Sequence, residues 1–282
     1  ELVTKRVWRV SRNRMGYKQL PAEELMVLIG GHPYIDVRNS FNSFLPKDLE
    51  DTTSGLLINA WLRRLNEHPE LHDKVEFEIA QTCMNFTFEQ DFHDRYQGVL
   101  SSAAFNNFRD AVRQLTNTNI DLGDKGTLRL SLDIIDQLST IQGQRLIPEK
   151  KRDGTDYLFS AIDLIDECAA MGTLPFSIIA RHAFIAEAII RSAMNRGAIR
   201  PERLLEFRRT IRSITSELTS DFNAVCRGNL SPAVFHYRYG HLRPGTYDIM
   251  SYRYDKVKDI KFGGQAKNQL KNKKFLLQKK QI

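Results

Sequence analysis

The stretch PFSIIARHAFIAEAIIRSAMNRG, residues 175–197, indicates a long helix in a mainly helical protein. Pro175 suits the first turn of a helix, where its missing N–H is not needed. Gly197 suits the position after the last turn, where the backbone often becomes left-handed. Arg181 and Glu187 interrupt the apolar run, so it falls short of the roughly 20 apolar residues that cross a bilayer.

Helix signals continue on both sides of this stretch. Gly172 is expected to stop the preceding helix, and Pro201 and Pro232 are placed to begin later ones. The spacing of apolar residues and the position of polar capping residues predict the other helices. The expected helices lie near residues 1–20, 51–65, 90–116, 127–142, 156–171, 175–196, 201–226 and 231–240.

Two features of the first third predict strands. Short apolar runs at 24–29 and 34–38 flank Gly30-Gly31-His32-Pro33, a combination typical of a β-hairpin. Residues 74–79 alternate polar and apolar residues, which predicts a strand with Val75, Phe77 and Ile79 facing inward. The expected class is therefore mainly α with a small β element (α+β), a helical bundle-like domain with a short sheet near its N-terminal third.

The charge of the chain is concentrated at its C-terminal end. The net charge is +7, but residues 256–282 contain nine lysines and one acid and so carry +8, which leaves −1 for the rest. A lysine tail can contact phosphates nonspecifically, but this one has no arginine and only one aromatic residue, Phe275. We therefore do not expect a nucleic-acid partner, and a tail that binds nucleic acid or an anionic surface is kept as a third interpretation. Since no apolar stretch is long enough to cross a bilayer, we expect no membrane partner.

The three cysteines, Cys83, Cys168 and Cys226, lie far apart and form no Cys-x-x-Cys pair. This spacing predicts neither a zinc site nor a disulfide framework, and we expect reduced, mostly buried thiols in a cytoplasmic protein. The sequence begins at Glu1 with no apolar leader, so we expect it to be part of something longer.

The polar segment 148–154 is the best candidate for a domain boundary. The expected organisation is a helical region with the small sheet and a binding loop at 1–147, a second helical region at 148–255, and a basic lysine-rich tail at 256–282.

The first candidate site lies between residues 33 and 46, after a strand-like run. Asp36, Arg38, Asn39 and Asn42 offer a carboxylate, a guanidinium and two amides, which suit recognition of a small polar molecule. The alternative is a turn in which Asp36 pairs with Arg38 while the asparagines and serines cap the local backbone.

The second candidate site lies between residues 237 and 255, where Arg and His alternate with Tyr and Asp. A turn at Pro244-Gly245 would bring the basic groups before it towards the acids after it. The candidate catalytic residues are His241, Arg243 and Asp248, and Tyr239 and Arg253 are candidate binding residues. Arg243 can hold a phosphate or carboxylate with two hydrogen bonds. The alternative is a network that only ties a helix end to a loop.

No Walker or Rossmann phosphate loop, HExxH or GxSxG motif occurs in the sequence. The run YGHLRPGTYDI, residues 239–249, instead resembles a motif of the phosphoenolpyruvate synthase/pyruvate phosphate dikinase family. This family includes the rifampicin phosphotransferases and glutamine kinase-like proteins of surface-polysaccharide pathways. Supporting runs are PYIDVR at 33–38, SFNSF at 40–44, HDKVEFE at 72–78 and GTLPF at 172–176.

The resemblance covers roughly residues 1–255 and implies a division of labour. In this family an ATP-grasp domain takes a phosphoryl group from ATP, a swivelling domain carries it on a histidine, and a third region binds the acceptor. The chain is similar to the third region. The family's phosphocarrier histidine lies in a Gly-Gly-x-x-Ser-His-like context, which neither His32 nor His241 has.

The function that the resemblance implies is the acceptor-binding part of an ATP-dependent phosphotransferase, with surface-polysaccharide modification as the expected setting. The intact enzyme would use ATP and Mg²⁺, and its ATP-grasp and swivelling histidine domains would lie outside this chain. The expected ligand is a small polar acceptor, and the alternative is a noncatalytic metabolite-binding or scaffolding module.

Overall fold

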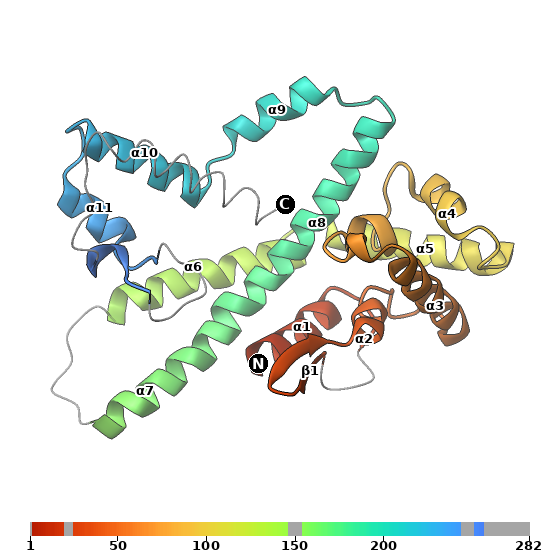
Figure 1. Cartoon of the computed structure of the whole chain (residues 1–282), viewed down its shortest axis with the longest axis horizontal. Helices are drawn as coiled ribbons and strands as arrows, with labels where there is room; N and C mark the ends of the chain where they lie inside the picture. The colour runs from red at the N-terminus through yellow and green to blue at the C-terminus, as the bar shows by residue number, and fades with distance from the viewer. Residues whose placement is uncertain (1, 20–24, 146–153, 244–250, 257–282) are drawn as a thin grey trace. The chain divides into compact units, whose positions relative to one another are not determined.

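The computed structural model describes residues 2–19, 25–145, 154–243 and 251–256. It is 69% helical, with eleven α-helices and a two-stranded sheet among the described residues, which confirms the predicted class (Figure 1). The chain divides into two compact units, Glu1–Arg200 and Pro201–Ile282. Each is described by itself.

The first unit contains eight of these helices and the sheet. Its elements are α1 (Leu2–Arg14), β1 (Met26–Ile29), β2 (His32–Ile35), α2 (Val37–Asn42), α3 (Asp51–Glu67), the turn η1 (Pro69–Leu71), the π-helical turn η2 (Val75–Ile79), α4 (Phe88–Tyr96), α5 (Ser102–Asn119), α6 (Thr127–Arg145), α7 (Gly154–Glu167), the π-helical turn η3 (Cys168–Thr173) and α8 (Leu174–Asn195).

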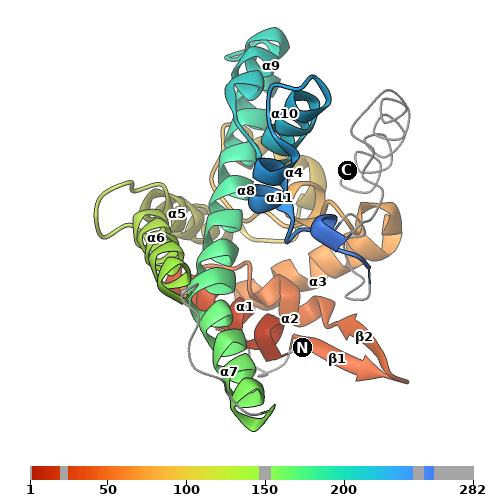
Figure 2. The same cartoon turned by 90° about the vertical axis from the view of Figure 1, so that its left-hand side faces the viewer.

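The predicted hairpin is confirmed. β1 and β2 pair antiparallel, with Met26 opposite Ile35 and Ile29 opposite His32. Gly30 and Gly31 connect them at φ angles of +59° and +81°, values that suit glycine and the twist of a two-residue hairpin. Figure 2 shows the two strands projecting from the unit, and their central residues are exposed.

The main core of the first unit is aromatic. Trp61 and Phe108 are fully buried, with Phe41 meeting the Trp61 ring edge-on at 5.7 Å between centroids. On α3, Leu57, Ala60 and Trp61 are buried, whereas Leu56 is 49% exposed. Burial of large rings provides much of the stability of such a core.

The strand predicted at 74–79 is wrong, since residues 75–79 form the π-helical turn η2. Arginines on two helices occupy its carbonyl oxygens: Arg64 Nε donates to Glu78 O at 2.9 Å, and Arg95 Nη1 donates to Phe77 O at 2.8 Å. The two acids of the alternation are both paired: Glu76 pairs with Arg181, and the partly exposed Glu78 pairs with Arg95. The polar positions of the alternation are therefore two ion-paired acids on a π-helical turn, and they are not one face of a strand.

The predicted stop at Gly172 is also wrong. The chain stays helical from Gly154 to Asn195, with η3 between α7 and α8. In η3 the Leu174 N–H donates to Ala169 O, one residue further back than in an α-helix. A π-helical turn widens the helix locally, which relieves the clash that Pro175 would otherwise make with the preceding turn.

Two other predicted helices are each divided. The one near 90–116 becomes α4 and α5, separated at Gly98, whose φ is +80°. The one at 201–226 becomes α9 and α10, because Ser213 starts a new helix with a capping box. Glu50 occupies the N-cap position of α3 and makes no side-chain capping hydrogen bond. The side chain of Asp51, the first helical residue, pairs with Lys18 at 2.5 Å.

One helix among the described residues, Gly154–Asn195, is long and apolar enough to cross a membrane by length and composition. Its second half is packed inside the first unit, where Ile178 and Arg181 are 3% and 2% exposed. Its first half, α7, has no buried residue, and Figure 2 shows it extending beyond α1.

The second unit contains α9 (Pro201–Thr210), α10 (Ile214–Cys226), α11 (Pro232–Tyr239) and the turn η4 (Tyr254–Lys256). As predicted, Ser231 caps α11 and Gly240 follows its last residue. Its small core consists of Phe222, Val225, Phe235 and Tyr239.

The division between the units falls at Arg200, whereas the predicted boundary at 147–148 lies outside the described residues. Residues of α8 belong to the first unit because they pack against α1, as the Ile178 contacts with Val7 and Met15 in one apolar cluster indicate. All three cysteines are free, but only Cys83 is buried, so the prediction of mostly buried thiols is wrong for Cys168 and Cys226.

Candidate functional site

The structure places the two predicted polar clusters in different units. The first cluster, with Asp36, Arg38, Asn39 and Asn42, lies around α2 of the first unit. The second, with Tyr239, His241, Arg243 and Arg253, lies at the end of α11 in the second unit. Asp248 lies outside the described residues.

Side chains of the first cluster bond to nearby protein groups. Asp36 is the N-cap of α2, accepting from the backbone and side-chain nitrogens of Asn39, both at 3.0 Å. Arg38 donates to the Asn59 side chain at 3.0 Å and does not pair with Asp36. Asn42 donates to the Gln19 carbonyl at 3.1 Å. The alternative interpretation had Asp36 paired with Arg38 and the asparagines and serines as caps, whereas in the structure Asp36 itself is the capping residue.

The segments before and after the second cluster's turn come together as the sequence predicts. Tyr254 N donates to Leu242 O at 2.8 Å, and Asp255 N donates to Gly240 O at 3.1 Å. Arg243 Nε donates to Ser251 O at 3.0 Å. The turn itself, residues 244–250, lies outside the described residues.

The predicted side chains of this cluster divide into two groups. Arg253 pairs with Asp255, at 2.5 Å between Nη2 and Oδ2, and His241 is exposed. Tyr239 faces the other way, towards α10, where its hydroxyl donates to Asp221 Oδ2 at 2.9 Å. Of the predicted residues within the described ranges, only Tyr239 therefore lines the groove of the second unit.

That groove has a volume of about 510 Å³ and lies between α10 and α11. We call it the α10–α11 groove. The sequence analysis did not select its other wall residues, although Glu217 and Asp221 are four residues apart and so share a helix face. Its lining is Arg212, Ser216, Glu217, Ser220, Asp221, Arg238 and Tyr239.

The centre of the α10–α11 groove is a charged network. Asp221 Oδ2 accepts from Arg238 Nη1 at 2.8 Å as well as from Tyr239. The hydrogen bonds from Arg238 and then Tyr239 lower the pKa of Asp221. Burial and the bond to Asp221 raise the pKa of Tyr239. At neutral pH the groove thus holds an ionised Asp221, a neutral phenol and a charged Arg238.

Two charged groups in the groove remain available to a ligand. Neither the guanidinium of Arg212 nor the carboxylate of Glu217 has a hydrogen bond or ion pair to another group within the described part of the chain. A free guanidinium can bind an anionic group, and a free carboxylate can accept a proton or hydrogen bond from a hydroxyl or amine.

Acidification should release the Asp221 network. Because the folded-state pKa of Asp221 is lowered, its contribution to stability is present above the ordinary aspartate pKa of about 3.9 and is lost as the pH falls through the folded-state value. Arg238→Met should raise the Asp221 pKa, measured by carboxyl NMR titration. Arg253→Met, whose partner is Asp255, should leave it unchanged. An unaltered Asp221 pKa in Arg238→Met would contradict this account.

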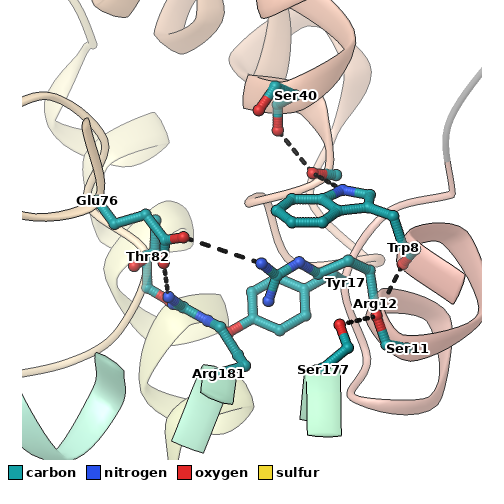
Figure 3. Close-up of polar contacts among 10 residues, drawn as sticks. Trp8, Ser11, Arg12, Tyr17, Ser40, Glu76, Thr82, Ser177 and Arg181 are labelled. Atoms are coloured by element: carbon teal, nitrogen blue, oxygen red, sulfur yellow. Dashed lines mark hydrogen bonds and ion pairs between the residues drawn. The ribbon is translucent and has the colours of Figure 1, made fainter. Parts of the chain in front are cut away.

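The first unit also contains a buried charged cluster that was not predicted from the sequence (Figure 3). Arg12 from α1 and Arg181 from α8 converge on Glu76 from η2. Arg181 makes an ion pair with Glu76 and also donates to the Tyr17 hydroxyl at 2.8 Å and to Thr82 O at 3.1 Å. Arg12 lies 3.9 Å from the other Glu76 oxygen. No local pattern could reveal it, since Glu76 and Arg181 are 105 residues apart.

In this cluster the single carboxylate of Glu76 faces the two buried guanidinium groups of Arg12 and Arg181. Nε and Nη1 of Arg12 have no hydrogen-bond partner among the described residues, and its guanidinium lies 4.3 Å from the Trp8 ring centroid. Burial and the nearby Arg181 lower the pKa of Arg12 to about 10. Burial alone would lower the pKa of Arg181 too, but Tyr17 and Glu76 keep it above its ordinary value. The cluster fixes η2 against α1 and α8.

No family model, curated protein or solved structure matches this chain. Within residues 2–19, 25–145, 154–243 and 251–256, no group of three His, Cys, Asp or Glu side chains is arranged to hold a metal ion.

Proposed function

We propose that this chain is the acceptor-binding part of an ATP-dependent phosphotransferase, and that the α10–α11 groove receives the acceptor. The observation that carries the proposal is the position of Tyr239. It begins the motif that resembles the dikinase family, and it lines a groove that has an uncommitted cation and an uncommitted carboxylate. The phosphoryl group would arrive on a histidine of another domain.

The groove residues have distinct roles in this proposal. Arg212 binds the incoming phosphoryl group and offsets the negative charge that spreads over its oxygens during transfer. Glu217 accepts the proton of the acceptor's attacking hydroxyl or amide group. Asp221 and Arg238 hold the Tyr239 hydroxyl in place, so Tyr239 orients the acceptor. Arg243 and Arg253 bond to Ser251 and Asp255, respectively, and have a supporting role at the end of α11.

The test uses the full-length protein with ATP, Mg²⁺ and a panel of amino acid, sugar and carboxylate acceptors. Acceptor-dependent release of AMP and phosphate is expected. Arg212→Ala should lower kcat/KM by about 10²-fold, the usual cost of losing one transition-state donor. Arg203→Ala is the matched control, because Arg203 is 80% exposed, pairs with Glu206 and lies outside the groove.

Two results would count against the proposal. Equal kcat/KM for Arg212→Ala and the parent would mean that the α10–α11 groove takes no part in the reaction. Acceptor binding without AMP release for any acceptor would favour the noncatalytic metabolite-binding module instead.

A further inference from the structure

The first unit contains a cavity of about 100 Å³ that the proposed function does not use. Its walls come from η2, the segment 80–88, α4 and α8. The polar lining includes Glu76, Gln81, Asn85, Asp91, Arg95 and Ser192. We call it the α4–α8 cavity.

Most polar groups in its wall already have partners. Arg95 donates to Phe77 O at 2.8 Å and pairs with Glu78 at 3.3 Å. Ser192 Oγ accepts from Phe86 N at 3.1 Å and donates to Ile189 O at 2.9 Å. Asn85 Oδ1 accepts from Thr87 N at 2.9 Å. Glu76 pairs with the two buried arginines.

Gln81 is an exception. Its side chain is buried, with the residue 8% exposed, and its Nε2 donates to Phe88 O at 2.8 Å. That bond fixes the orientation of the amide, because only the nitrogen can donate to a carbonyl. The Gln81 Oε1 is left buried, with no partner among the described residues. A buried acceptor without a donor is costly.

Asp91 is the second exception. Its Oδ2 accepts from Thr87 Oγ1 at 2.8 Å. No Lys, Arg or His within the described ranges lies within ion-pair distance of it. Gln81 Oε1 and the second carboxylate oxygen of Asp91 are therefore acceptors that have no donor among the described residues.

We infer that the α4–α8 cavity binds the ammonium group of a small primary amine. An ammonium group carries one positive charge and three donors, which can serve Asp91, Gln81 Oε1 and one further acceptor. A cavity of about 150 Å³ can hold benzene, so 100 Å³ restricts the enclosed part of the ligand to about four heavy atoms. The Gln81 and Asp91 oxygens offer no donor to an anion, and the two guanidinium groups of the wall, Arg95 and Arg191, already pair with Glu78 and Glu187. The inference is independent of the α10–α11 groove.

The test titrates methylammonium chloride into the full chain and follows chemical shifts by NMR. Tetramethylammonium chloride at equal concentration is the matched ligand control, because it has the same charge but no N–H donor. Saturable shifts at residues 80–91 are expected with methylammonium only. A Kd of about 10 mM is expected, since two heavy atoms limit the affinity.

Asp91→Asn should weaken methylammonium binding at least tenfold, because it removes the charge while an amide oxygen can still accept from Thr87. Asp94→Asn is the control, because Asp94 lies on the same helix but is exposed and outside the cavity. Far-UV circular dichroism and thermal unfolding verify that both variants fold. Equal responses to the two ammonium ions, unchanged binding by Asp91→Asn, or saturable binding of inorganic phosphate at this site would each overturn the inference.

Discussion

Glu76→Gln should destabilise the first unit by about 3–5 kcal/mol, the usual cost of removing one partner from a buried ion pair. Glu76 supplies the carboxylate that faces both Arg12 and Arg181, which are 5% and 2% exposed. Glutamine keeps the size and can accept one hydrogen bond, but it leaves two buried positive charges facing each other. The loss should appear as a lower free energy of unfolding.

Tryptophan fluorescence during urea unfolding can measure this effect, because both tryptophans, Trp8 and Trp61, lie in the first unit. Glu78→Gln is the matched control on the same turn. Glu78 has a side chain 38% exposed and pairs with Arg95, so its loss should cost at most about 1 kcal/mol. Equal destabilisation by the two variants would mean that the buried cluster contributes no more to the free energy of unfolding than the Glu78–Arg95 pair does.

Phe235→Ala should destabilise the second unit by about 3–5 kcal/mol, through lost burial and the cavity left behind. Phe235 is fully buried, and its ring lies 5.8 Å from that of Phe222 and 5.1 Å from that of Tyr239. The apolar cluster between α10 and α11 has only four buried residues in the described part of the chain. The substitution should therefore disrupt both the packing of α10 on α11 and the groove between them.

Hydrogen exchange measured by peptide across residues 214–239 can detect this loss. Tyr237→Ala on the same helix is the control, since Tyr237 is 86% exposed and should change stability by less than about 0.5 kcal/mol. Exchange in α3 and α5 should stay as in the parent. Slow exchange retained in α10 of Phe235→Ala would contradict the assigned role of this core.

Local sequence signals correctly predicted the elements whose cause is also local. Gly30 and Gly31 predict the hairpin because each adopts a positive φ in the turn. Ser231 and Pro232 predict the start of α11 because capping and proline act within one turn.

The errors arise where a distant partner changes a local preference. The alternation at 74–79 indicates a strand, but Arg64, Arg95 and Arg181 bind that segment from three other helices. Gly172 favours a helix end, but one π-helical turn lets the helix continue through it and Pro175. The groove residues Arg212 and Glu217 were missed because each is an ordinary charged residue until α11 packs beside α10.

Periodicity, caps and glycine turns in the amino-acid sequence were enough to specify a mainly helical chain with one hairpin, since these signals act over a few residues. The tertiary structure alone specified the buried Arg12–Glu76–Arg181 cluster, the α4–α8 cavity and the α10–α11 groove. Each requires side chains from separate elements to meet, and their charges and hydrogen bonds gain specific partners only after the chain has packed.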